Sequence, residues 1–84
     1  MQNGKRFVYL LKTVNRPHRP YVGVTSNVAR RLEAHNTCLG IYTSRWRPWQ
    51  LIVAVEFLDE ARALSFERYL KSGSGRAFAR RHFE

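Results

Sequence analysis

The sequence has little of what marks secreted or membrane proteins. Cys38 is its one cysteine, so no internal disulfide can form, which suits a reducing compartment. Its apolar runs are far shorter than the roughly 20 residues of a membrane-spanning helix, and its polar, basic N-terminus lacks a signal-peptide pattern. We therefore expect a cytoplasmic protein without membrane contact.

Acidic side chains are also missing from the first part of the chain, where seven basic residues precede the first acid, Glu33. The formal net charge is +9 on 84 residues, and arginine greatly outnumbers lysine. The arginine fork suits phosphate oxygens, so this balance favours a nucleic-acid partner over a generic solvated surface. A hydrophobic fraction of 44% is too high for a disordered basic tail, and the length predicts a single domain over residues 1–84.

Hydrophobic patterning predicts an α+β fold. Runs rich in β-branched and aromatic residues predict strands at 6–13, 20–25 and 50–57, and we expect the last to be central. The first two form a hairpin. Helices are expected from a cap at Thr25 or Ser26 to Asn36, from a cap at Asp59 over residues 60–71, and in the C-terminal tail. The second helix should end at the SGSG signal, with Gly73 as its C-cap. The order β-β-α-β-α-α indicates a small three-stranded, largely antiparallel sheet flanked by helices.

Glu67 stands out because its position follows the apolar face of the second helix, with Ala63, Phe66 and Leu70. Burial of an unpaired carboxylate costs several kcal/mol, so we expect Glu67 to have a cation or metal partner or to lie at the edge of a cleft. One interpretation is an ion pair with Arg31 or another arginine. The other is a Mg²⁺ ligand, because Mg²⁺ often takes one or two protein carboxylates and completes its shell with water and phosphate.

Five further residues have positions that suggest a site. Arg31 and His35 are four residues apart on the first helix and share a face, from which Arg30 points away. Tyr9 and Tyr21 lie on the two hairpin strands, where aromatic packing is the commoner role. Gly23 weakens its strand, which suggests that another backbone or a ligand approaches it closely.

Together these residues resemble the GIY-YIG nuclease family over nearly the whole chain. Phe7-Val8-Tyr9 and Tyr21-Val22-Gly23 stand at its two triplets, Arg31 at its catalytic arginine, His35 one helical turn later, and Glu67 at its metal-binding glutamate. YVGVTSNVARRLEAHN is especially similar to small stand-alone bacterial and phage members related to the excision-repair nuclease subunit. Phe7 replaces the first glycine, and no late asparagine follows Glu67.

The resemblance implies a metal-dependent DNA endonuclease of repair or recombination, with Tyr9, Tyr21, Arg31, His35 and Glu67 as its catalytic residues. Glu67 would hold one Mg²⁺ (or Mn²⁺), and Arg31 would clamp the scissile phosphate. Tyr9 would act as general base or orient the attacking water, for which it needs adjacent cations or transfer of its proton to His35. Tyr21 would contact the phosphate or the water.

Substrate binding is expected outside this group, where aromatic rings can stack on bases and arginines can follow the phosphates. The residues expected to contact nucleic acid are Gly23, Tyr42, Arg45, Trp46, Arg47, Lys71 and Arg76. Trp46 and Trp49 have an alternative role as core cover, which we favour for Trp49. No sequence-reading module is apparent, so we expect selectivity for branched, nicked or single-stranded DNA, or specificity supplied by a partner protein.

Two alternatives belong to other functional classes. The first is a non-catalytic nucleic-acid-binding module on the same fold, with Glu67 paired to Arg31. The second is a zinc site built from Cys38 with His18, His35 and His82, which the spacing disfavours because no pair has the usual ligand separation.

Overall fold

The computed structural model describes residues 5–15, 20–37 and 46–84. Its elements are β1 (Arg6–Lys12), β2 (Tyr21–Thr25), α1 (Val28–Asn36), β3 (Gln50–Phe57), α3 (Glu60–Leu70) and α4 (Gly73–His82). This is the predicted order β-β-α-β-α-α. The three strands form one antiparallel sheet, which confirms the predicted α+β fold.

The strand order is β2-β1-β3, so the central strand is β1. The prediction that residues 50–57 form the central strand is therefore wrong. β1 carries four consecutive buried residues, Val8 to Leu11, because both faces of the sheet are covered there. β3 is equally apolar in composition but is an edge strand whose Leu51 is 41% exposed. Apolar content alone does not distinguish these two positions.

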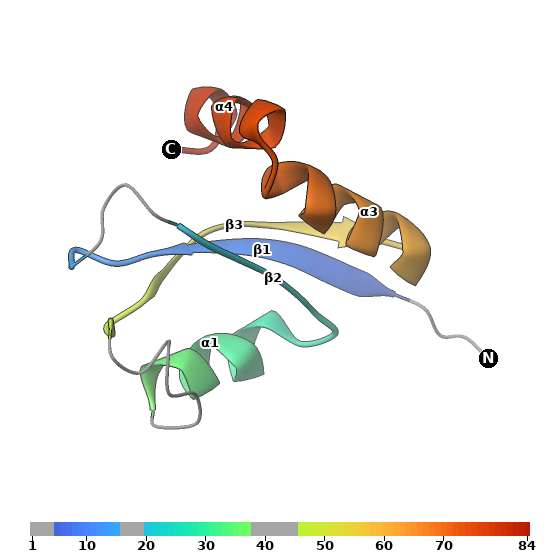
Figure 1. The fold of residues 1–84 in the computed structure, drawn as a ribbon. Helices are drawn as coiled ribbons and strands as arrows, with labels where there is room; N and C mark the ends of the chain where they lie inside the picture. The colour runs from blue at the N-terminus through green and yellow to red at the C-terminus, as the bar shows by residue number, and fades with distance from the viewer. Residues whose placement is uncertain (1–4, 16–19, 38–45) are drawn as a thin grey trace.

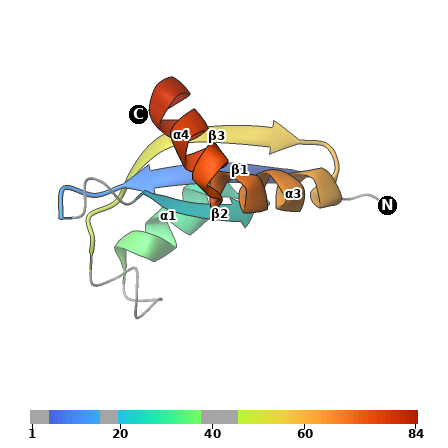
Figure 2. The ribbon, with the colours of Figure 1, turned by 45° about the horizontal axis from the view of Figure 1, so that its top comes forward.

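Alternation along β1 creates a core on each face of the sheet. Val8 and Leu10 pack with residues of α3 and α4, and Tyr9 and Leu11 pack with Trp49 on the opposite face. Figure 1 shows α1 on one side of the sheet and α3 and α4 on the other, and Figure 2 shows α4 crossing over the strands. Side chains from helices on opposite faces of the sheet can therefore meet only beyond one of its edge strands.

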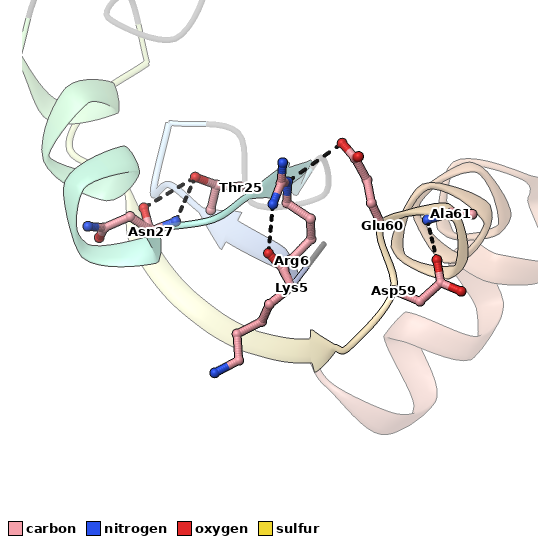
Figure 3. Close-up of polar contacts among 7 residues, drawn as sticks. All are labelled: Lys5, Arg6, Thr25, Asn27, Asp59, Glu60 and Ala61. Atoms are coloured by element: carbon pink, nitrogen blue, oxygen red, sulfur yellow. Dashed lines mark hydrogen bonds and ion pairs between the residues drawn. The ribbon is translucent and has the colours of Figure 1, made fainter. Parts of the chain in front are cut away.

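Polar caps fix where two of the helices begin (Figure 3). Asn27 is the N-cap of α1, rather than Thr25 or Ser26, and its Oδ1 accepts a hydrogen bond from the Arg30 N–H at 3.0 Å. The Thr25 hydroxyl instead accepts from the Asn27 N–H and so shapes the turn before the helix. Asp59 caps α3 as predicted, through a 2.8 Å bond from the Ala61 N–H.

α3 ends just before the segment SGSG, as predicted, but the prediction that Gly73 is its C-cap is wrong, because Gly73 is the first residue of α4. Lys71 is the C-cap of α3, with a right-handed helical backbone. Ser72 then caps α4, and its hydroxyl accepts from the Gly75 N–H and donates to the Tyr69 carbonyl. A serine N-cap lets one helix follow another with almost no linker.

Within the described residues, no helix has both the length and the apolar character to cross a membrane.

We expect Gly75→Ala to lower the free energy of unfolding by about 1–3 kcal/mol, the usual cost of overpacking. A Cβ at Gly75 would overlap the Tyr69 carbonyl and lie 2.6 Å from the Leu70 Cα, both backbone groups that cannot rotate away. Gly73→Ala is the matched control, because no atom lies within 4 Å of a Cβ there. Urea denaturation measures both, and equal stability of the two variants would contradict this account of the helix junction.

Candidate active site

Tyr9 lies across the edge strand at Gly23. The two residues are direct partners in the β1–β2 register. A Cβ on Gly23 would lie 2.5 Å from Tyr9 Oη and 2.6 Å from Cζ, so the phenol ring occupies the space that a side chain would take. A close approach to Gly23 does occur, but it is made by the side chain of Tyr9 and not by a backbone or a ligand as predicted. The absence of a side chain at this position lets the ring of a central-strand residue pass over β2.

His35 holds the Tyr9 hydroxyl from the last turn of α1. Its Nε2 lies 3.0 Å from Tyr9 Oη, and the ring is buried, with 6% exposure. The Tyr21 ring meets the His35 ring edge-on, with centroids 4.6 Å apart. Tyr9, Tyr21 and His35 thus form one aromatic group, of which Tyr9 and Tyr21 reach the cleft described below.

Burial decides the protonation of this group. It raises the pKa of Tyr9 well above its usual value, as does the neighbouring Tyr21, whereas Arg31 opposes the shift and Glu67 adds to it. Burial also lowers the pKa of His35, and the positive charge of Arg31 acts in the same direction. Near neutral pH, both side chains are therefore uncharged, and a phenol faces an imidazole.

A cleft of about 510 Å³ opens beside β2, where residues from both helical layers meet. Tyr9, Tyr21 and Gly23 contribute to it from the sheet, and Arg31 comes from α1 on one face. α3, α4 and the junction between them contribute from the other face, through Glu67, Lys71, Arg76 and Arg80. The cleft therefore combines residues that are far apart in the sequence. Arg31 lines it and Arg30 does not, in agreement with the predicted difference between these neighbours.

Glu67 has a lysine partner. Its side chain is 20% exposed, and its Oε2 lies 3.0 Å from the Lys71 Nζ, one helical turn later. The predicted pair with Arg31 or another arginine does not form among the described residues, whose other ion pairs are Lys5–Glu56 and Arg6–Glu60. The half-buried position on the apolar face of α3 agrees with the helical spacing, since Ala63 and Leu70 are buried beside it.

The donor set at Glu67 fits a hard divalent cation that keeps water and takes phosphate oxygens. A carboxylate in a cleft supplies an oxygen ligand of the kind Mg²⁺ prefers, and an open cleft leaves room for the other ligands. The described residues contain no cluster of three His, Cys, Asp or Glu side chains that could hold a metal alone. Cys38 and His18, named for a zinc site, lie outside the described residues.

Of the remaining residues expected to bind nucleic acid, the structure brings Gly23, Lys71 and Arg76 to the cleft. Tyr42 and Arg45 lie outside the described residues. Trp46 packs partly buried against the cluster of Tyr9, Leu11 and Trp49, and Arg47 donates a hydrogen bond to the Thr37 carbonyl. Neither lines the cleft. Trp49 is 3% exposed, which confirms its role in the core.

Asn36 is a supporting residue that we expected only as a helix stop. Its Oδ1 accepts from the Trp49 N–H at 2.6 Å, and its Nδ2 donates to the Trp49 carbonyl at 3.1 Å. This two-point clamp ties the end of α1 to the residue before β3. The Trp49 ring in turn packs near Tyr21 and His35, with centroids 6.0 and 6.3 Å away. An asparagine at a helix end has several common roles, so the sequence alone does not indicate this one.

Comparison with known proteins points to one family of nucleases. The family described as "GIY-YIG catalytic domain" matches residues 5–81. Structure-specific endonuclease subunit SLX1 of Candida dubliniensis is 39% identical over 71 residues, covering 76% of this chain and 25% of the relative. The corresponding proteins of Debaryomyces hansenii and Talaromyces marneffei are 41% and 40% identical, over 76% and 70% of this chain and 20% and 17% of their own lengths. The chain thus spans a quarter or less of these relatives.

We expect the protein to lose stability as the pH falls from 7.5 to 5.5, by up to about 1 kcal/mol through His35. The unfolded chain takes up a proton near pH 6.5, whereas the folded His35, with its lowered pKa, resists protonation. The unfolded state then binds more protons, so stability rises with pH across this window.

Urea denaturation of His35→Gln and of the control His82→Gln at several pH values tests this assignment. The first variant should have a smaller pH slope than the wild type, and the second, at an exposed position, should keep it. Identical slopes for all three proteins would contradict the burial of a neutral His35.

Proposed function

This chain belongs to the GIY-YIG family, and we propose that its cleft hydrolyses phosphodiester bonds in DNA as a divalent-metal-dependent endonuclease. The observation that carries the proposal is the meeting of Arg31 and Glu67, from helices on opposite faces of the sheet, with the Tyr9–His35 pair. An anion-binding side chain, a metal-binding carboxylate and a proton-transfer pair in one cleft are the parts that phosphodiester hydrolysis needs.

The substrate we infer is DNA with a branch, a nick or a single-stranded region, consistent with relatives named structure-specific endonuclease subunits. Their description as subunits supports a partner protein that supplies further specificity. We assign the catalytic unit to residues 1–84 as one domain, acting in repair or recombination, and we place it in the cytoplasm on the basis of its lack of paired cysteines.

Proton transfer follows from the protonation of the buried pair. The raised pKa of Tyr9 means that it keeps its own proton near neutral pH, and the lowered pKa of His35 means that its ring is unprotonated and has a nitrogen available to accept one. We assign His35 the Nδ1–H tautomer, so that Nε2 accepts the proton of the Tyr9 hydroxyl across 3.0 Å. The phenol oxygen is then free to accept a hydrogen bond from the attacking water and to pass its proton to His35. Of the two possibilities left open by the sequence, this geometry favours transfer to His35 over activation by neighbouring cations.

The other side chains bind and orient the phosphate. Arg31 clamps its non-bridging oxygens, whose negative charge rises during the reaction. Tyr21 donates a hydrogen bond to the phosphate or to the water. Glu67 holds the divalent ion (Mg²⁺ or Mn²⁺), which when bound stabilises the charge on the leaving 3′ oxygen. The products are a 5′-phosphate and a 3′-hydroxyl.

We expect Glu67→Gln and Tyr9→Phe to lower the rate of cleavage of branched DNA by about 100-fold or more each, because they remove the metal ligand and the proton-transfer hydroxyl. A nicking assay with Mg²⁺ on flap, nicked and single-stranded DNA measures this. The matched controls are Glu33→Gln and Tyr69→Phe, which change exposed residues outside the cleft and should retain activity.

Wild-type protein that binds these DNAs but cleaves none of them with Mg²⁺ or Mn²⁺ would establish the alternative, a non-catalytic nucleic-acid-binding module. Cleavage by Glu67→Gln at the wild-type rate would instead move the metal site elsewhere.

The cleft wall formed by α4 should contribute to DNA affinity. Arg76 and Arg80 are exposed, one helical turn apart, and both line the cleft, so each can neutralise a phosphate. Removal of one phosphate-binding charge reduces the slope of log affinity against log salt by about 1, so Arg76→Ala with Arg80→Ala should reduce it by about 2.

Fluorescence anisotropy in EDTA, where no cleavage occurs, measures this slope. The control pair is Arg30→Ala with Arg81→Ala, which removes the same charge from exposed positions outside the cleft. An equal reduction of the slope in both double variants would show that only total charge matters.

A further inference from the structure

Lys71 forms an ion pair with Glu67, the carboxylate that the proposed reaction needs for its metal ion. Its Nζ lies 3.0 Å from Glu67 Oε2, within the distance of a charge-assisted hydrogen bond. Both residues line the cleft, at the point where α3 ends and the turn to α4 begins. This ammonium neutralises a carboxylate whose side chain is only 20% exposed.

An ammonium group and a divalent cation cannot share one carboxylate oxygen in this cleft without strong repulsion, because water screens them only partly there. Even if the divalent cation takes the other carboxylate oxygen, the two positive charges repel each other, so binding of one weakens binding of the other. The lysine is the one that can leave at little cost, since its side chain is 53% exposed and sits on a flexible stem. It therefore competes with the metal and is also able to move away.

A DNA phosphate bound in the same cleft would offer Lys71 an alternative partner. Arg31, Arg76 and Arg80 surround the cleft with the charges that bring a phosphate backbone to it. A phosphate bound there attracts the ammonium away from Glu67 and leaves the carboxylate available.

On the basis of the proposed function, we propose that Lys71 couples metal binding to DNA binding, by holding Glu67 in the free protein and releasing it to a divalent cation when DNA phosphate enters the cleft. This coupling keeps the affinity of Glu67 for a divalent cation low until DNA is bound. By thermodynamic linkage, the factor by which DNA strengthens metal binding equals the factor by which metal strengthens DNA binding. This coupling concerns binding equilibria and is therefore measurable without catalysis.

Mn²⁺ binding to the free protein, followed by the electron paramagnetic resonance of unbound Mn²⁺, tests the competition. We expect Lys71→Met to bind Mn²⁺ about threefold or more tightly than the wild type, because the competing cation is gone. Arg68→Met is the matched control, since it removes one positive charge from the same helix at an exposed position outside the cleft. Its Mn²⁺ affinity should remain within about twofold of the wild type.

The second measurement adds a 5′-flap DNA in a Tyr9→Phe background, which suppresses cleavage. The flap DNA should strengthen Mn²⁺ binding by a larger factor when Lys71 is present than in Lys71→Met, and Arg68→Met should behave as the protein with Lys71. Equal Mn²⁺ affinities of free wild type and Lys71→Met, or equal factors with DNA, would overturn the coupling.

Failure of the metal site itself is recognised separately. If Glu67→Gln binds Mn²⁺ as tightly as the wild type, the metal binds elsewhere. That result would contradict both the proposed function of this cleft and the proposed role of Lys71. If Mn²⁺ binding depends on Glu67 but is unaffected by Lys71→Met, only the coupling falls. Thermal unfolding of each variant shows that it is folded at the temperature of the titration.

Discussion

The contact between the Tyr9 ring and the bare backbone of Gly23 determines what the rest of this site can be. Tyr9 belongs to the central strand, and alternation directs its side chain to the face covered by α1. Glu67 belongs to α3 on the other face. Because Gly23 has no Cβ, the phenol can lie over the edge strand and reach the cleft that Glu67 also lines. A side chain at Gly23 would close this passage and separate the two faces.

Burial also sets the protonation states of Tyr9 and of its hydrogen-bond partner His35. The site places two neutral groups, Tyr9 and His35, in hydrogen-bond contact and leaves the charged groups more exposed around them. A phenol with a raised pKa keeps its proton until a base takes it, and the lowered pKa of His35 keeps that base unprotonated at neutral pH. The charge of Arg31 acts on both groups. It opposes the rise in the pKa of Tyr9, and it also disfavours protonation of His35. Asn36 supports the arrangement from outside, by fixing the Trp49 backbone behind the aromatic group.

Local patterns in the sequence predicted most elements and the position of Glu67 on its helix. The order of the elements, the cap at Asp59 and the half-buried Glu67 all follow from spacing within one element, and the structure agrees. The errors concern relations between elements. An apolar strand at the edge has the composition of a central one, as β3 shows, and Gly73 after a helix indicates a stop equally well whether a loop or another helix follows. The Asn36 clamp and the Glu67–Lys71 pair depend on side-chain geometry that no residue pattern specifies.

A cleft that binds a polyanion has a physical reason to avoid carboxylates, yet Glu67 lies inside this one. Unpaired, it would repel the phosphates that we propose Arg31, Arg76 and Arg80 bind, and its partial burial would raise the free-energy cost of its charge. A paired lysine removes both difficulties while no metal is bound. Replacing Glu67 by a neutral residue would remove them too, at the loss of an oxygen ligand. The combination of a half-buried glutamate with a displaceable cation therefore favours a site that exchanges one positive charge for another over a surface that only binds nucleic acid.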